Sequence, residues 1–180
     1  MSRLATRLLA SLGLLFLAQS GYAETASLAL LLGPAIRSVD GTAMGFELKG
    51  GYRVLPTLVT SLYYWRVSSG ADISGSGTSL STSDSMSSFG AEALYAFPGS
   101  NWSAGAKLGM SKNSKDGSAS SETSTVSLSD SHSSLTVSPT VVYEIPVSFM
   151  VVGAEASYFY SLSSSVPKAL SLMVEGKLRF

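Results

Sequence analysis

The last eleven residues of the chain, Leu170-Ser-Leu-Met-Val-Glu-Gly-Lys-Leu-Arg-Phe180, decide the fold class. The even positions of this stretch hold apolar residues or glycine, and the odd positions hold Ser171, Met173, Glu175, Lys177 and Arg179. Successive side chains of a β-strand point to opposite faces, so a period of two separates an apolar face from a charged one. The stretch therefore predicts a strand that meets two different environments.

The same alternation recurs upstream and predicts eight strands. The first is more uniformly apolar, which leaves its register weakly defined. The third is also ambiguous, although Arg66 suggests its inward face. The expected strands are residues 27–36, 44–53, 58–67, 89–97, 102–110, 135–145, 152–158 and 170–180. Pro139 cannot donate a ladder hydrogen bond, so we expect a bulge or locally broken pairing in the sixth strand.

The connections alternate between short turns with proline and longer polar segments. This alternation is typical of a barrel with turns at one rim and loops at the other. The short turns are 53–56, 97–100 and 144–146, and the longer segments are 37–42, 68–88, 111–134 and 161–168. The two longest are rich in Ser, Thr and Gly and predict flexible hydrophilic loops. The alternative function for these two segments is adhesion or host recognition. The alternative structure is an extension of the strands above the membrane as a β-ribbon.

Composition is compatible with a membrane barrel. Hydrophobic residues make up 45% of the chain and charged residues 13%, yet no segment after the N-terminal region holds 18 consecutive apolar residues. A closed barrel satisfies every backbone group by strand pairing, so it needs no such segment. A secreted β-sandwich remains possible on composition alone. With the alternation, we expect an all-β, eight-stranded antiparallel up-and-down transmembrane β-barrel over residues 24–180.

The N-terminus predicts export. Arg3 and Arg7 precede an apolar stretch at 8–18, and small residues at Gly21 and Ala23 favour cleavage before Glu24. This order is typical of a secretory signal peptide over residues 1–23. The expected location is a bacterial outer membrane, with both ends of the mature chain in the periplasm.

Aromatic residues are expected to form two girdles at the membrane interfaces. Those near the periplasmic rim are Tyr52, Tyr95, Phe97, Trp102, Tyr143 and Phe180, and those near the outer rim are Phe46, Trp65, Phe89 and Tyr158.

At this point the chain resembles the small outer-membrane barrels of the OmpA-transmembrane and OmpX type. The resemblance covers residues 24–180 and depends on strand number, loop alternation and the terminal strand. It implies that the outer-membrane assembly machinery reads Val174, Gly176, Leu178 and Phe180, with Gly176 departing from the usual large apolar residue. We expect no peptidoglycan-binding domain after the barrel, so the cell-wall tethering of the longer members of the family is not carried over to this chain.

The inward face is expected to carry eleven charges: Glu47, Lys49, Arg53, Arg66, Glu92, Lys107, Glu144, Glu155, Glu175, Lys177 and Arg179. Ions in a narrow lumen must be paired or hydrated, because isolated ones are very costly. Their nearly balanced signs favour an ion-pair plug and hence a structural or surface-interaction scaffold. A narrow channel or transporter for polar solutes is the alternative. A soluble lipid-binding barrel is less favoured, because its apolar face would point inward.

An enzyme is not expected. His132, Ser134 and Glu144 resemble the order in barrel lipases that deacylate lipopolysaccharide, but ten residues of strand separate Ser134 from Glu144 and span the membrane. We expect no cofactor, no metal site and no nucleic-acid partner. The expected partners are outer-membrane lipids, lipopolysaccharide and the assembly machinery, and the sequence identifies no extracellular ligand.

Overall fold

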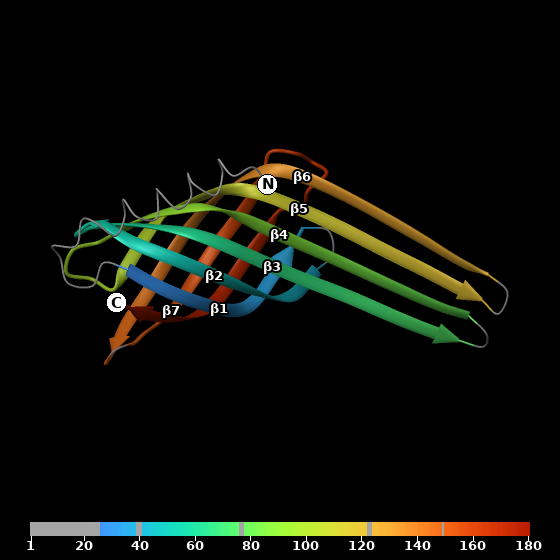
Figure 1. The fold of residues 1–180 in the computed structure, drawn as a ribbon, viewed down its shortest axis with the longest axis horizontal. Coiled ribbons are helices and arrows are strands. Elements are labelled where there is room, and N and C mark those ends of the chain that lie inside the picture. Colours follow the sequence, from blue (N-terminus) through green and yellow to red (C-terminus); the bar gives the residue numbers. More distant parts are fainter. Residues whose placement is uncertain (1–25, 39–40, 76–77, 122–123, 149) are drawn as a thin grey trace, which may run out of the picture.

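The computed structural model describes residues 26–38, 41–75, 78–121, 124–148 and 150–180, which form a closed ring of eight strands (Figure 1). Each strand pairs antiparallel with its neighbours in sequence, and β8 pairs with β1 to close the ring. The predicted fold class is confirmed. The strands are β1 (Ala26–Arg37), β2 (Gly41–Leu55), β3 (Leu58–Gly75), β4 (Thr78–Ala96), β5 (Trp102–Ser121), β6 (Thr125–Val147), β7 (Met150–Ser161) and β8 (Ala169–Arg179).

The predicted signal peptide, residues 1–23, lies outside the described residues. Within the part of the chain that the structure describes, no helix is long and apolar enough to cross a membrane.

The outer surface of the ring is apolar. In β8, Leu172 and Val174 are exposed, whereas Met173 and Glu175, which alternate with them, are buried. β1 has the same alternation, and its weakly predicted register is now fixed by Leu31, which is fully buried. Exposed aliphatic side chains around a closed ring match the lipid-facing band of a transmembrane barrel.

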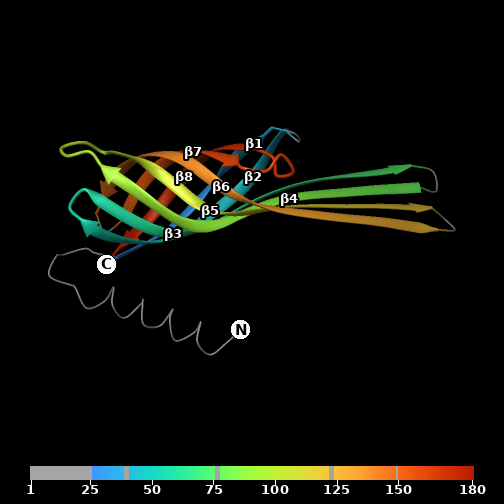
Figure 2. The same cartoon turned by 90° about the horizontal axis from the view of Figure 1, so that it is seen from above.

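Four strands continue beyond the ring on one side. β2 stops pairing with β3 at Met44↔Ser68, and β7 stops pairing with β6 at Thr136↔Ser161, but the pairing among β3, β4, β5 and β6 continues. Figure 2 shows the resulting four-stranded sheet extending well past the ring. We call it the blade, residues 69–75, 78–87, 112–121 and 125–133. The opposite end of the ring, which holds the turns after β2, β4 and β6 and both Ala26 and Phe180, is the short-turn rim.

The prediction of flexible loops at 68–88 and 111–134 is therefore wrong, and the strand extension noted as an alternative is what the structure has. Polar composition does not prevent strand formation when a ladder already nucleated in the barrel supplies partners for the next backbone groups. The two hairpins β3–β4 and β5–β6 also pair with each other through β4 and β5, so each stabilises the other.

The register of β3 is the reverse of the one that Arg66 suggested. Tyr63, Trp65 and Val67 point into the barrel, and Trp65 has no exposed surface. Arg66 is exposed on the outer surface, paired with Phe46 of β2. Placing Arg66 in the lumen and Trp65 in the outer girdle are both corrected. Arg66 lies two residues before the level at which β2 leaves β3, so its long side chain can reach the membrane interface.

Pro139 interrupts one ladder as expected. β6 pairs with β7 at Thr136↔Ser161 and Val137↔Tyr160 and resumes at Thr140↔Ser157, in the same register. On its other side Pro139 stays paired with Ala106 of β5. The local loss of pairing is therefore one-sided and introduces no bulge.

Candidate functional site

The centre of the barrel holds a buried ion cluster of Glu47, Lys49, Glu92, Lys107 and Glu155, which we call the central cluster. The Lys49 Nζ lies 3.0 Å from Glu92 Oε1 and also donates to the Glu155 carboxylate. The Lys107 Nζ donates to Glu47 Oε1 and to Glu155 Oε1. All five side chains are at most 5% exposed. Five residues that are up to 108 positions apart in sequence thus meet because they occupy inward positions at one level of the ring.

A second ion cluster lies nearer the short-turn rim. Glu144 of β6 accepts from Lys177 and from Arg179 Nη2 at 3.0 Å, and the Lys177 Nζ lies 3.1 Å from Glu175 Oε1. Gly153 of β7 lies between Glu144 of β6 and Glu175 of β8. A Cβ at Gly153 would lie 3.4 Å from Glu175 Oε2. The small residue leaves room for the charged side chains of β6 and β8 to meet across β7.

Two of the predicted lumen charges belong to neither cluster. Arg66 is outside the barrel, as described above. Arg53 does point inward, but it lies at the short-turn rim, where its Nη1 donates to the Pro56 carbonyl oxygen at 3.3 Å. Among the described residues, no carboxylate lies within ion-pair distance of Arg53.

Sequence reasoning missed a third cluster, at the base of the blade. Arg37 of β1 donates to Asp84 Oδ1 at 2.7 Å and to Ser69 Oγ at 2.5 Å, and Lys115 lies 3.2 Å from Asp84 Oδ2. Arg37 is only 3% exposed. All four residues fall in segments that the sequence predicts to be loops. The alternation of inward and outward positions in β1 could have revealed Arg37, because Arg37 lies on the same inward face as Leu31.

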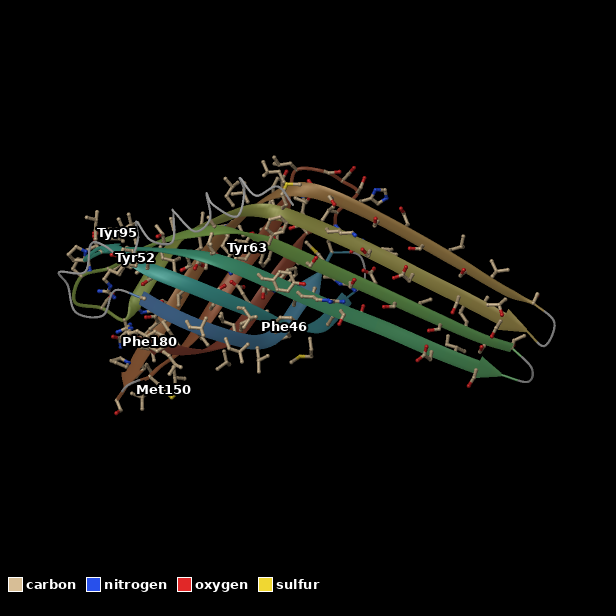
Figure 3. All side chains as sticks on the ribbon, viewed as in Figure 1. Phe46, Tyr52, Tyr63, Tyr95, Met150 and Phe180 are labelled. Carbon is tan, nitrogen blue, oxygen red and sulfur yellow. The ribbon has the colours of Figure 1, made fainter. Side chains whose placement is uncertain are left out.

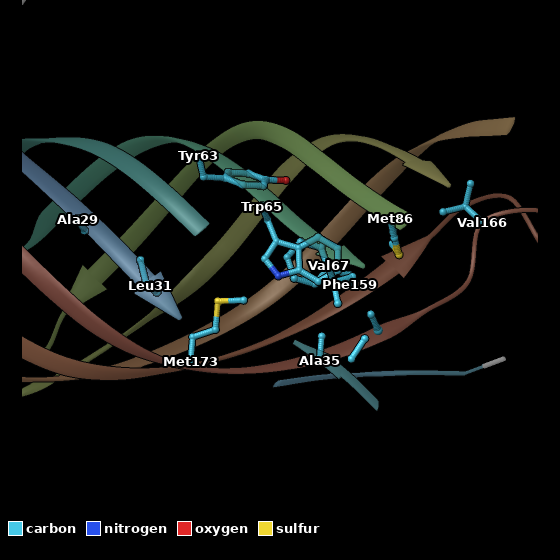
Figure 4. Close-up of a cluster of buried hydrophobic side chains, with 12 residues drawn as sticks. Ala29, Leu31, Ala35, Tyr63, Trp65, Val67, Met86, Phe159, Val166 and Met173 are labelled. Carbon is cyan, nitrogen blue, oxygen red and sulfur yellow. The ribbon is translucent and has the colours of Figure 1, made fainter. Parts of the chain in front are cut away.

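An aromatic layer also fills the lumen, and the sequence did not reveal it. Trp65 and Phe159 stack with ring centroids 4.3 Å apart, and both are fully buried (Figure 4). The Lys107 Nζ lies 5.6 Å from the Phe159 ring centroid and 5.1 Å from that of Tyr63. Along β3, Trp65 lies between Tyr63, which faces the central cluster, and Ser69, which contacts Arg37. The aromatic layer therefore separates the central cluster from the cluster at the blade.

The remaining predicted girdle residues lie on the outer surface or at the rims. Trp102 and Tyr143 contact each other at 4.8 Å between ring centroids, and Tyr95 and Phe97 at 5.5 Å. Figure 3 shows Tyr52, Tyr95 and Phe180 near the short-turn rim and Phe46 at the other end of the ring. The other two predicted residues, Phe89 and Tyr158, are exposed on the outer surface. The proposed assembly residues Val174, Gly176, Leu178 and Phe180 share the outward face at the end of β8.

The two faces of the blade differ sharply in chemistry. The outward face is dominated by serine, and the hydroxyl groups of Ser79 and Ser120 bond each other at 2.6 Å. The inward face, continuous with the lumen, exposes an apolar group near the tip. Its members are Ile73, Leu80, Val126 and Leu128, from 45% to 75% exposed. The serines of the outward face are Ser68 at its base and Ser74, Ser79, Ser81, Ser83, Ser85, Ser87, Ser114, Ser118, Ser120, Ser127, Ser129, Ser131 and Ser133.

The lipase-like residues do not meet. His132 Nε2 lies 3.0 Å from Asp130 Oδ2 on the exposed blade, whereas Glu144 is held by Lys177 and Arg179 near the short-turn rim. In the described ranges, no group of His, Cys, Asp and Glu side chains is arranged to hold a metal ion.

The central cluster makes a specific prediction about stability. Replacing Lys107 with alanine leaves Glu47 without its hydrogen-bonding partner in the lumen and should lower the free energy of unfolding by about 3–5 kcal/mol, the usual effect of breaking a buried ion pair. The measurement is urea unfolding of the refolded protein in detergent micelles. Arg66→Ala is the matched control, because it removes one cation from the outer surface and should change stability by at most about 0.5 kcal/mol. Equal losses in the two variants would contradict the pairing.

A scan against protein-family models finds no match, and a search of curated protein sequences finds none either. Solved structures do match. The attachment invasion locus protein Ail of Yersinia pestis, in complex with the heparin analogue sucrose octasulfate, has a TM-score of 0.63 at 18% identity, covering 87% of this chain and 97% of that one. A second structure of Ail has a TM-score of 0.60 at 17% identity, covering 88% and 100%.

A major outer membrane protein from Thermus thermophilus has a TM-score of 0.53 at 14% identity, covering 88% of this chain and 100% of that chain. Such low identities establish shared architecture alone. Strand number, closure, the apolar outer surface and these matches agree. The chain has the fold of the small eight-stranded β-barrels of bacterial outer membranes.

Proposed function

We propose that this protein is a non-conducting barrel of the bacterial outer membrane that presents the blade at the cell surface as an interaction scaffold. One observation carries the proposal: the lumen is filled by side chains while half of the strands continue into an exposed sheet. A channel needs an open path and gains nothing from a long sheet beyond the membrane. A surface scaffold needs no open path, and it uses a sheet that extends beyond the membrane.

The orientation follows from the lengths of the connections. Barrels of this kind have short periplasmic turns and longer extracellular extensions. The short-turn rim, with Ala26 and Phe180, is therefore assigned to the periplasm and the blade to the outside. Aromatic residues such as Trp102 and Tyr143 support a position of the short-turn rim at a membrane interface, because their rings suit the lipid headgroup region.

Three filled layers support a closed lumen. The central cluster, the Trp65–Phe159 stack and the Arg37–Asp84 pair occupy successive levels of the interior. Removing side chains from any one layer exposes another behind it. An eight-stranded barrel has an interior only wide enough for such side chains, so no separate path for solutes is required or favoured.

The blade supports a role in surface interaction. Its strands are paired over their whole length, so its side chains occupy fixed positions relative to the membrane. Ail, which has the same fold, is named for attachment and was solved with a heparin analogue. Here the segments 68–88 and 111–134 contain two lysines against four aspartates and one glutamate. That balance disfavours a polyanion such as heparin as the partner of this blade.

The proposed partners in the envelope are lipids and lipopolysaccharide around the apolar outer surface and the assembly machinery at β8. Leu178 and Phe180 lie on one exposed face at the end of the last strand, where a second sheet could recognise them. The distance between His132 and Glu144 gives no support to a catalytic role, and we propose none.

The unmodified protein should give no steady single-channel conductance in planar lipid bilayers. Trp65→Gly, Phe159→Gly, Lys107→Gly and Arg37→Gly combined should give discrete openings, because together they remove side chains from all three layers of the lumen. The control is Leu62→Gly, an outward-facing position that should leave the barrel silent. Steady conductance of the unmodified protein would overturn the closed lumen and favour the channel.

Labelling on intact cells tests the orientation. The chain contains no cysteine, so Ser83→Cys on the blade and Ser100→Cys at the short-turn rim each provide a single thiol on an exposed residue. A membrane-impermeant maleimide should react with the blade thiol on intact cells and with the other only after the outer membrane is permeabilised. The opposite pattern, or equal labelling, rejects the proposed surface display.

The assembly role of Phe180 is tested by Phe180→Ala, with Phe97→Ala as a second exposed aromatic at the same rim. We expect the first variant to accumulate several-fold less in outer membranes than the second, although both refold in detergent once purified. Equal membrane levels would show that Phe180 serves only as an interfacial aromatic.

A further inference from the structure

The lumen opens at the short-turn rim into a vestibule whose charges are unbalanced. The vestibule has a volume of about 430 Å³ and is lined by residues of every strand except β7 and by the turns 56–57 and 97–101. Its charged lining residues are Arg53, Glu144, Lys177 and Arg179. Glu144 is the partner of both Lys177 and Arg179, and Lys177 also lies 3.1 Å from Glu175 Oε1, so among the described residues Arg53 is the lining cation that has no carboxylate partner.

Arg53 supplies the uncompensated charge. Its hydrogen bond to the Pro56 carbonyl oxygen uses one of the five N–H groups of the guanidinium. With no carboxylate within ion-pair distance in the described part of the chain, the remaining donors point to solvent or to a ligand. Arginine binds carboxylate and phosphate groups in a planar, two-pronged geometry, which makes a free guanidinium at a cavity wall a specific anion donor.

Small residues keep the space between the two arginines open. Ser27 of β1 pairs with Gly51 of β2 on one side and with Arg179 of β8 on the other. A Cβ at Gly51 would lie 2.7 Å from the Ser27 Oγ, so glycine there prevents a side chain from closing the gap. Arg53 and Arg179 therefore flank β1, on strands about 10 Å apart by the usual strand spacing.

We propose that this vestibule binds a small soluble anion with two or more carboxylate or phosphate groups, held between Arg53 and Arg179 over Ser27. The volume falls within the range of small-molecule sites, roughly 300–1,000 Å³. The cations occupy inward positions, so the site opens into the barrel mouth and not toward the lipid. This distinguishes a soluble anion from a phospholipid headgroup. The site is independent of the blade and of its proposed role.

The probe is tripolyphosphate, titrated at low ionic strength against the refolded full-length barrel in zwitterionic detergent. Arg53→Gln should weaken its binding by roughly tenfold or more, because a charge-assisted hydrogen bond is lost. Arg53→Lys should retain part of the affinity, since it keeps the charge without the two-pronged geometry. Arg66→Gln removes the same charge from the outer surface and should leave binding unchanged.

Arg53 belongs to no ion pair in the described residues, so its variants should fold as the unmodified barrel does, and unchanged urea unfolding verifies this. No binding of tripolyphosphate overturns the proposal, as does an equal loss in Arg53→Gln and Arg66→Gln. The lipid source is tested in nanodiscs. Unchanged binding in discs that contain an anionic phospholipid supports a soluble ligand, whereas competition by that lipid reassigns the site to a headgroup and overturns it.

Discussion

The structure depends on one constraint: a backbone amide or carbonyl group surrounded by hydrocarbon must have a hydrogen-bonding partner within the protein. Closing the sheet between β1 and β8 meets that constraint for every strand of the ring and removes the free edges. Closure then divides each strand into lipid-facing and lumen-facing positions. The interior of an eight-stranded ring is just wide enough for side chains to fill, so the buried charges of the central cluster are stabilised by pairing with each other.

The interior shows how this pairing is arranged. Glu155 serves both lysines of the central cluster, and Glu144 serves both Lys177 and Arg179. Each shared carboxylate connects strands that do not pair directly, so the ion pairs link strands two or three positions apart in the ring, whereas the ladders link neighbours. Arg53 stands outside this system, although it shares a face with Glu47 and Lys49 in β2.

How far the sequence predicts this structure depends on how many residues constrain each assignment. β8 was predicted well because glycine or apolar side chains and charged ones alternate over its whole length. β3 was not, because a single arginine was used to set its inward face, and a long side chain near a membrane interface satisfies its charge from either face.

The blade was missed for a different reason. Serine-rich sequence has no strong local preference for strands, and what makes it extended here is the ladder rising from the barrel beneath it. The stack of Trp65 on Phe159 depends on two strands meeting across the lumen, which no local pattern reveals. The central cluster could be predicted as a set of residues, but which lysine meets which glutamate required the register.

The continuity of β3 to β6 from the ring into the blade has a mechanical consequence. The β4–β5 ladder runs unbroken from Ala96↔Ser103 at the short-turn rim to Thr78↔Ser121 at the tip. A tensile load applied at the tip along the strands is therefore carried in shear by many hydrogen bonds at once, and not by unzipping them singly. The membrane-embedded half of the same strands anchors the blade, so a force on the tip is transmitted directly to the barrel.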